Sequence, residues 1–251
     1  MSAPVTLPRV AWGDPGAERQ ALLVHGLGSS GALMWRYGVA LAEAGWYALA
    51  VDLRGHGTAP RTLDYTLAAY ASDLAELRSA DGVWDLVLGH SLGGAAVTLV
   101  AADDAHWTRR LILVDPALQM SSSERETIRK SQEAAFADPT VDAVWTEHPN
   151  WHPQDIELKA LATRQASRWA IEQTSTQNAE WDLRGAAARL TVPTRVIAAD
   201  PRVHSIFTGQ VVQDVLTNPL CSMTVVPDAG HSPHRDEPEA TVAALFEALK
   251  A

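Results

Sequence analysis

One serine of this chain lies in a sequence context that favours nucleophilic chemistry. The pentad Gly89-His90-Ser91-Leu92-Gly93 follows the apolar run 86–88 and precedes the small-residue run 94–97. This order predicts a strand, a sharp turn and a helix, with the serine held in a strained backbone conformation at the turn. The glycines two residues to either side leave the space that such a turn requires. We therefore expect Ser91 to stand above the end of a strand as a nucleophile.

A serine hydroxyl becomes an effective nucleophile when a base accepts its proton and a carboxylate orients that base. Among the nine histidines, His231 is the best candidate base, because it lies in a Gly-His-Ser-Pro loop after the last apolar run. Asp115 and Asp200 each end an apolar run and precede a proline, so the local sequence scarcely separates them. We favour Asp200, because it is nearer in the chain to the run that leads to His231, and consecutive strands tend to be neighbours. The predicted catalytic group is Ser91, His231 and Asp200, with Asp115 as the alternative acid.

Six apolar runs are predicted to form the sheet that positions these residues. They lack the alternation of a sheet with one wet face, and helix-like segments separate most of them, which favours a mostly parallel α/β sheet. The predicted strands are 21–24, 47–51, 86–88, 111–114, 195–198 and 223–226. The predicted helices are 35–44, 66–79, 92–102, 205–216 and 238–250. Ligands bind beyond the carboxyl ends of such strands, and His25, Asp52, Ser91, Asp115 and Asp200 all lie there.

The stretch from about 118 to 189 interrupts this pattern, because it shows helical patches and polar turns but no convincing strand. We expect it to be a helical cap inserted over a core made of residues 1–117 and 190–251. It holds four of the nine tryptophans, Trp145, Trp151, Trp169 and Trp181. Large aromatic side chains are typical of apolar ligand pockets, although they equally hold small helical units together. Trp145 and Trp151 are the predicted substrate-binding residues.

Composition limits the partners that this chain is expected to have. Its formal net charge of −10, without any basic block, argues against binding to nucleic acid. The first five residues have neither a basic start nor an apolar stretch, and no run approaches a membrane span, so we expect a cytoplasmic protein with no membrane partner. Cys221 is the only cysteine, which excludes an internal disulfide and the cysteine-rich zinc patterns. We expect a small-molecule substrate, no metal and no cofactor, and the oligomeric state is left open.

These motifs together resemble the α/β-hydrolase superfamily over nearly the whole chain apart from the cap. The residues that carry the resemblance are His25–Gly28, Asp52–Gly57, the pentad around Ser91, Asp200 and Gly230–His234. The resemblance implies a mostly parallel sheet of the eight-stranded type, flanked by helices. It also implies an oxyanion hole made by the backbone N–H groups of Leu27 and Leu92.

Related enzymes that cleave alkyl halides or epoxides have an aspartate where Ser91 stands, so the resemblance favours acyl transfer through an acyl-enzyme. We expect a carboxylic ester hydrolase acting on apolar or aromatic esters, since few arginines lie near the motifs. The same residues would also suit a carbon–carbon bond hydrolase, a lactonase, or a cofactor-free lyase or oxygenase.

A different class of protein matches one segment of the sequence. The run 26–31, Gly-Leu-Gly-Ser-Ser-Gly, follows a predicted strand, and Asp52 lies about twenty residues further on, as in a dinucleotide-binding fingerprint. This hypothesis leaves the serine turn and His231 unexplained. Dinucleotide binding is therefore kept as an outside alternative.

Overall fold

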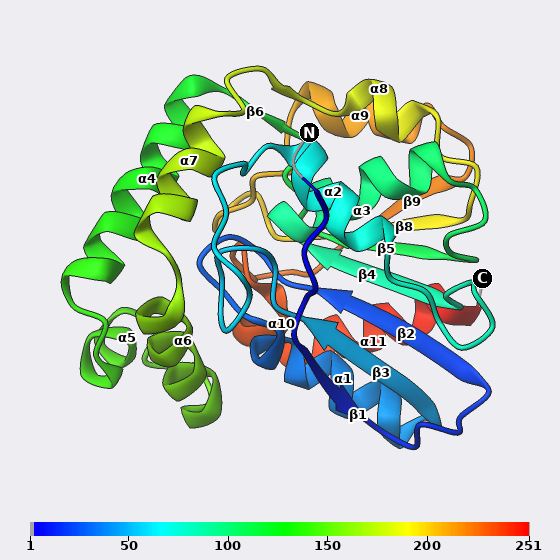
Figure 1. The fold of residues 1–251 in the computed structure, drawn as a ribbon, viewed down its shortest axis with the longest axis horizontal. Helices are drawn as coiled ribbons and strands as arrows, with labels where there is room; N and C mark the ends of the chain where they lie inside the picture. Colours follow the sequence, from blue (N-terminus) through cyan, green and yellow to red (C-terminus); the bar gives the residue numbers. More distant parts are fainter. Residues whose placement is uncertain (1–2, 251) are drawn as a thin grey trace.

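Seven strands form the main sheet in the computed structural model, which describes residues 3–250. All neighbours pair in parallel except β1, which pairs with β3 antiparallel at one edge (Figure 1). In order across the sheet the strands are β1 (Arg9–Trp12), β3 (Trp46–Val51), β2 (Arg19–Val24), β4 (Leu86–His90), β5 (Leu111–Val114), β8 (Thr194–Ala198) and β9 (Cys221–Val225).

Six of these seven strands coincide with the apolar runs, which confirms the predicted α/β fold class. The seventh, β1, was not predicted, because its four residues alternate between exposed and half-buried positions. The resemblance implied a sheet of the eight-stranded type, and the sheet of residues 3–250 has one strand fewer. Residues 3–8, which precede β1, form no strand. Pro4 and Pro8 in this stretch have no N–H to donate to a ladder.

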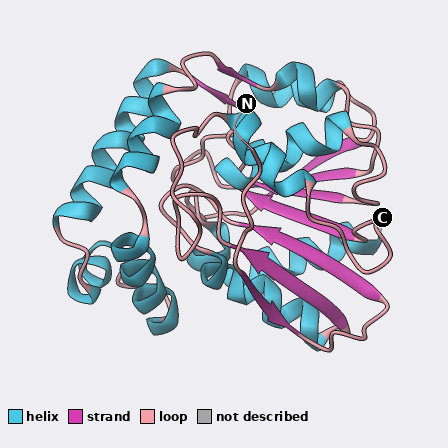
Figure 2. Cartoon of the chain, in the orientation of Figure 1, coloured by secondary structure: helices cyan, strands magenta, loops and turns pink. Residues whose placement is uncertain are grey.

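Helices cover both faces of the sheet, because alternate side chains of each buried strand point to opposite sides. Leu22 and Val24 of β2 pack in the core on one face, and Ala21 and Leu23 pack in the core on the other. The first face is covered by α2 (Leu67–Ala75), α3 (Leu92–Asp103), α8 (Arg184–Ala188) and α9 (Gln210–Leu216). The second face is covered by α1 (Trp35–Glu43) and α11 (Pro238–Lys250), and α1 follows the 3-10 helix η1 (Gly31–Met34) (Figures 1 and 2).

Four further helices, the α4–α7 segment, stand beside the carboxyl ends of the strands and apart from both sheet-covering layers (Figure 1). They are α4 (Ser122–Ala137), α5 (Val141–Glu147), α6 (Pro153–Gln165) and α7 (Arg168–Thr176). Side-chain caps define where they begin: Ser121 and Glu124 form a capping box for α4, and Thr140 and Ser167 accept hydrogen bonds from the first turns of α5 and α7. These caps set the helix boundaries within the stretch that was expected to be helical.

A short antiparallel ladder pairs residues that precede α4 with residues that follow α7. β6 (Gln119–Met120) and β7 (Trp181–Asp182) pair antiparallel, so the stretch contains two short strands that the sequence did not reveal. Each has only two residues, too few to produce a recognisable pattern. Among residues 3–250, none of the helices is both long enough and apolar enough to cross a lipid bilayer.

Candidate active site

Ser91 lies at the sharp turn that the pentad predicts, between β4 and α3. Its φ of 53° and ψ of −117° are a backbone conformation that side chains other than glycine rarely adopt. A Cβ at Gly93 would come within 2.4 Å of the carbonyl oxygen of Val24, and one at Gly89 within 2.7 Å of the carbonyl oxygen of Gly93. Both positions therefore exclude larger residues, and α3 approaches the sheet closely at its first turn.

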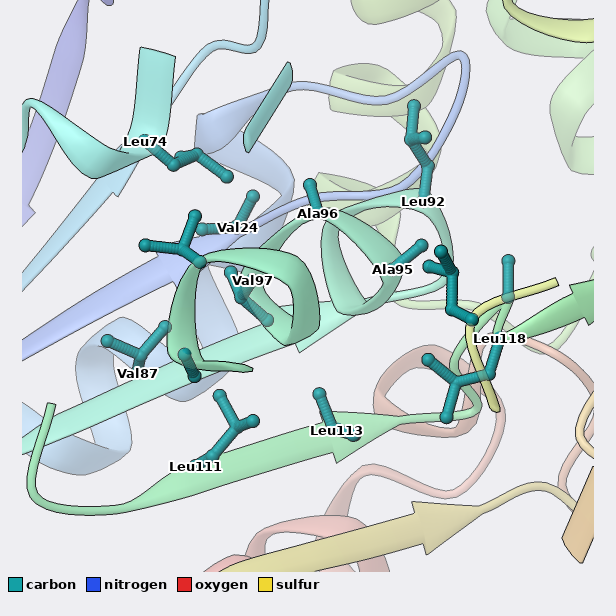
Figure 3. Close-up of a cluster of buried hydrophobic side chains, with 14 of the residues drawn as sticks. Val24, Leu74, Val87, Leu92, Ala95, Ala96, Val97, Leu111, Leu113 and Leu118 are labelled. Atoms are coloured by element: carbon teal, nitrogen blue, oxygen red, sulfur yellow. The ribbon is translucent and has the colours of Figure 1, made fainter. Parts of the chain in front are cut away.

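The small residues of α3 keep this helix against the sheet along its length. Ala95, Ala96 and Val97 are fully buried and pack over Val87 of β4 and Leu113 of β5 (Figure 3). The strained turn is thus held between a fixed strand and a fixed helix.

His231 connects the serine to a carboxylate. Its Nε2 lies 3.0 Å from Ser91 Oγ, and its Nδ1 lies 2.6 Å from Asp115 Oδ2. Nδ1 donates to the carboxylate, which leaves Nε2 free to accept the serine proton. The side chain of His231 is 25% exposed, whereas that of Asp115 is completely buried. The three residues form a hydrogen-bonded chain from a buried carboxylate to a hydroxyl at the surface of a cavity.

Several donors hold Asp115 in its charged form. Burial by itself raises the pKa of Asp115, but the hydrogen bond and the charge of His231, together with bonds from Ser205 Oγ at 2.5 Å and from the Ile206 N–H at 3.1 Å, bring it below the ordinary value. The N–H of Ala199 donates to Oδ1, which also accepts from Ser205, while His231 and Ile206 donate to Oδ2. This carboxylate is therefore ionised and fixed in orientation at neutral pH.

The prediction that Asp200 orients His231 is wrong, and Asp115, the alternative, takes this place. Asp200 accepts bonds from its neighbour Arg202, with Nη2 at 2.6 Å, and from the N–H of Asp228 at 3.0 Å. These partners hold the pKa of Asp200 well below its ordinary value. The loop after β9 carries His231 across β8 to the end of β5, so nearness along the chain was a misleading guide.

Leu27 and Leu92, the predicted oxyanion-hole residues, both line the cavity beside Ser91. Leu92 is the first residue of α3, where a helix leaves its N–H groups without internal partners and carries partial positive charge. Within the part of the chain that the structure describes, neither N–H takes part in a hydrogen bond. Both groups are thus available to a ligand atom.

Two neutral histidines fix the loops around this site. Burial lowers the pKa of His25 to about 4. Its ring joins the loop after β2 to the loop after β3, because Nδ1 donates to the carbonyl of Gly26 and Nε2 accepts from the N–H of Leu53. Burial also lowers the pKa of His90 well below its ordinary value, and its Nε2 donates to the carbonyl oxygen of His231 at 2.8 Å. His25 positions the loop that carries Leu27, and His90 positions the backbone of the candidate base.

The cavity that Ser91 and His231 open into has a volume of about 700 Å³, which suits a small molecule. Its apolar wall includes Met120, Ile128 and Ile171. Of the two tryptophans predicted to bind substrate, only Trp151 lines it, with its Nε1 donating to Asp236. Trp181 lines it too, and its Nε1 donates to the carbonyl of Ala117.

The assignment of Trp145 to the cavity is corrected. Trp145 is 47% exposed and is not among the lining residues. Val144 packs with Trp151 and Ile156, so the next residue of α5, rotated by about 100° around the helix, faces outward. Trp169, the fourth tryptophan of the stretch, is also half exposed.

Asp52 is engaged in the structure of the glycine-rich loop itself. One carboxylate oxygen accepts from the N–H of Gly31 at 2.8 Å, and the other accepts from the N–H and hydroxyl of Thr58. Asp52 therefore has a structural role in this loop, and its position after the run 26–31 does not require a bound nucleotide. Nothing in the geometry favours the dinucleotide alternative over the serine site.

Comparisons with known proteins agree with this fold. The sequence profile described as "Alpha/beta hydrolase family" matches residues 21–245. Lipase LipV from Mycobacterium tuberculosis is 32% identical over 126 residues, which are 50% of this chain and 46% of that protein. The match thus spans about half the length of that lipase.

Two other relatives match the chain over nearly its full length. The 2-succinyl-6-hydroxy-2,4-cyclohexadiene-1-carboxylate synthase of Klebsiella pneumoniae is 26% identical, over 94% of this chain and 96% of the synthase. An esterase from Exiguobacterium antarcticum superposes with a TM-score of 0.80 at 18% identity, with 100% of both chains covered. At this identity the likeness concerns the fold.

Proposed function

Because the chain belongs to the α/β-hydrolase family, we propose that it is a serine hydrolase that cleaves carboxylic esters of small molecules through an acyl-enzyme. The observation that carries this proposal is the hydrogen-bonded chain from Asp115 through His231 to Ser91 Oγ. A serine at the strained turn suits attack on a carbonyl carbon.

The reaction follows from the positions of the three side chains. His231 Nε2 accepts the proton as Ser91 Oγ bonds to the ester carbonyl carbon, and Asp115 stabilises the imidazolium that results. The N–H groups of Leu27 and Leu92 donate to the oxygen on which negative charge develops. His231 then protonates the leaving alcohol, and water repeats the sequence on the acyl-enzyme, releasing the acid.

The cavity supports a small substrate with an apolar portion. Met120, Ile128, Ile171 and Trp181 offer an apolar surface within reach of Ser91. The α4–α7 segment supplies two of these side chains, in keeping with the proposed role of a cap over the site. The apolar or aromatic character that we expect of the ester rests on this wall.

The proposal is tested with Ser91→Ala. The wild-type protein is expected to react with a fluorophosphonate probe and to hydrolyse a short-chain p-nitrophenyl ester, and Ser91→Ala to lose labelling and to lower kcat by roughly five orders of magnitude or more. Ser175→Ala is the control, because Ser175 lines the same cavity but does not bond to His231. Ester hydrolysis that survives in Ser91→Ala at the wild-type rate contradicts the proposal.

A second candidate is the cofactor-free lyase, in which His231 acts as the base and no acyl-enzyme forms. The observation that favours it is the full-length similarity to the Klebsiella synthase. Under this alternative Ser91 would donate a hydrogen bond and would not become acylated. Trapping of an acyl group on Ser91, detected by intact-protein mass spectrometry during turnover, decides for the hydrolase.

A further inference from the structure

Two cationic side chains from different helices contact the same loop of the cavity. Lys159 on α6 donates from Nζ to the carbonyl of Gly28 at 2.9 Å. Arg235 on α10 (Pro233–Asp236) has its Nη2 3.4 Å from Ser29 Oγ. Both line the cavity that holds Ser91. Positive charge therefore gathers beside the loop that carries Leu27.

Arg235 is a buried charge with incomplete hydrogen bonding. Arg235 is only 5% exposed, and its Nε has no hydrogen-bond partner among the described residues. The guanidinium lies over the ring of Trp151, 5.1 Å from its centre. A buried charge is costly unless it is paired, so an unpaired guanidinium facing a cavity indicates a missing anionic partner.

The nearby carboxylates do not fill this role. Within residues 3–250, neither Lys159 nor Arg235 has a carboxylate oxygen within 4.0 Å. Asp155 binds Arg36 and the indole of Trp35. One oxygen of Asp236 accepts from the indole N–H of Trp151, and the other accepts from the N–H of Gly230. The acidic groups closest to the two cations are thus engaged elsewhere.

Burial disfavours the charged form of both cations, and the charge of Arg235 further disfavours that of Lys159. Burial, followed by the charge of Arg235, lowers the pKa of Lys159 to about 8, while Glu147 at the end of α5 opposes this shift. Burial likewise lowers the pKa of Arg235, while the charges of Asp155 and Asp236 oppose this shift. An anion bound close to both groups would offset the cost of burying their charges.

We propose that Lys159 and Arg235 bind a carboxylate group of the substrate, so that the enzyme prefers esters whose acyl chain ends in a carboxylate. This inference rests on the proposed hydrolase function and names its substrate class. It revises the expectation of an apolar or aromatic ester, which was based on the few arginines near the motifs. Arg235 lies four residues after His231 in the sequence, and the fold buries it against the cavity. The apolar wall then contacts the middle of the substrate, and the two cations contact its charged end.

A matched pair of substrates tests the proposal. Monoethyl glutarate and ethyl pentanoate share a five-carbon acyl chain and differ in the terminal carboxylate, and pH-stat titration follows both. The wild-type kcat/KM is expected to favour monoethyl glutarate by about tenfold or more. Lys159→Met should lower this ratio at least tenfold, and Lys159→Arg should retain most of it. Lys130→Met is the control, because it removes a lysine charge from the exposed face of α4 and should leave the ratio unchanged.

The pH dependence gives a second readout. Lys159 faces Arg235 from α10, Glu147 from α5 and the carbonyl of Gly28. Because the Lys159 ammonium loses its proton as the pH rises through about 8, while the glutarate carboxylate stays ionised, the preference should weaken above that pH. Lys159→Arg should remove this decline.

The outcomes separate this inference from the proposed function. Hydrolysis of both esters with equal kcat/KM, or a ratio that Lys159→Met does not change, overturns the carboxylate site and leaves the hydrolase. Failure to hydrolyse either ester, with no fluorophosphonate labelling of Ser91, overturns the hydrolase itself. Calorimetric binding of glutarate to Ser91→Ala, weakened at least tenfold by adding Lys159→Met, supports the carboxylate site independently of turnover, and equal binding to both contradicts it.

Discussion

Asp115 and Asp200 follow neighbouring parallel strands, yet their carboxylates serve different partners. The register pairs His90 with Val114, so Asp115 lies directly beside Ser91 on the adjoining strand. It also pairs Val114 with Ile197, which places Asp200 beyond the end of β8, two residues further out than the position opposite Asp115. There the carboxylate of Asp200 accepts from Arg202, whereas the carboxylate of Asp115 accepts from the imidazole of His231.

We expect Asp115→Asn to lower kcat by roughly a thousandfold or more, because an amide cannot hold His231 in the tautomer that accepts the serine proton. Asp200→Asn should leave kcat within a few-fold of the wild type. Steady-state kinetics of the two variants on one p-nitrophenyl ester makes the measurement. Equal losses in both would mean that the His231–Asp115 bond does not orient the base.

At the scale of single residues, sequence reasoning located Ser91 and His231 because each has local signals: flanking glycines, and a loop after the final strand. It could not select between the two aspartates, because the choice depends on strand order and loop path. One signal was available. Arg202, two residues after Asp200, is a local partner for that carboxylate, and Asp115 has no basic residue so near in the chain.

The turn between β4 and α3 is the element on which the site depends most. Its glycines allow the first turn of α3 to approach the carbonyl of Val24, and the buried alanines of that helix keep it there (Figure 3). Ser91 keeps its strained φ because neither element can move away.

Gly93→Ala should therefore destabilise the fold by about 1–3 kcal/mol and reduce activity, because the new methyl group would overlap the Val24 carbonyl oxygen. Gly185→Ala in α8 is the matched control. No atom lies within 4 Å of the methyl group it adds, and alanine in a helix is about 1 kcal/mol more favourable than glycine. Urea unfolding measures both variants. A Gly93→Ala protein as stable and active as the wild type would disprove the tight packing.

Sequence reasoning found the strands whose burial leaves a continuous apolar run. The five internal strands read as continuous apolar runs because helices cover both faces of the sheet, and the edge strand β9 overlaps the apolar run 223–226. The edge strand β1 and the two-residue strands β6 and β7 were missed, since short or half-exposed strands carry little pattern. The expected helix 205–216 begins only at Gln210, because Ser205 and Ile206 instead donate to Asp115.

At the scale of the whole molecule, a buried ion pair joins the loop after β3 to a helix and to the chain's beginning. Arg54 binds Asp73 of α2 through Nε and Nη2, both at 2.6 Å, and both side chains are fully buried. The N–H of Val5 donates to the same carboxylate. Three distant parts of the sequence thus meet at one carboxylate.

Asp73→Asn should lower the free energy of unfolding by about 3–5 kcal/mol, because the buried Arg54 guanidinium loses the charged carboxylate that it binds through two nitrogens. Glu247→Gln is the control, since it breaks the exposed pair with Lys250, and such pairs contribute about 1 kcal/mol or less. Chemical denaturation of both variants at pH 7 makes the comparison. A loss no larger in Asp73→Asn than in Glu247→Gln would show that the buried pair contributes little.

The α4–α7 segment touches the catalytic loops at several defined points. Lys159 binds the Gly28 carbonyl, Trp151 binds Asp236 behind the loop of His231, and the N–H of Ser167 donates to the carbonyl of Gly55. A chimaera that exchanges this segment for one without Trp151 and Lys159 would leave Asp236 Oδ1 and the Gly28 carbonyl without their donors. Altering selectivity by grafting therefore demands that the receiving loops be replaced together with the helices, whereas single substitutions on the apolar wall leave these attachments intact.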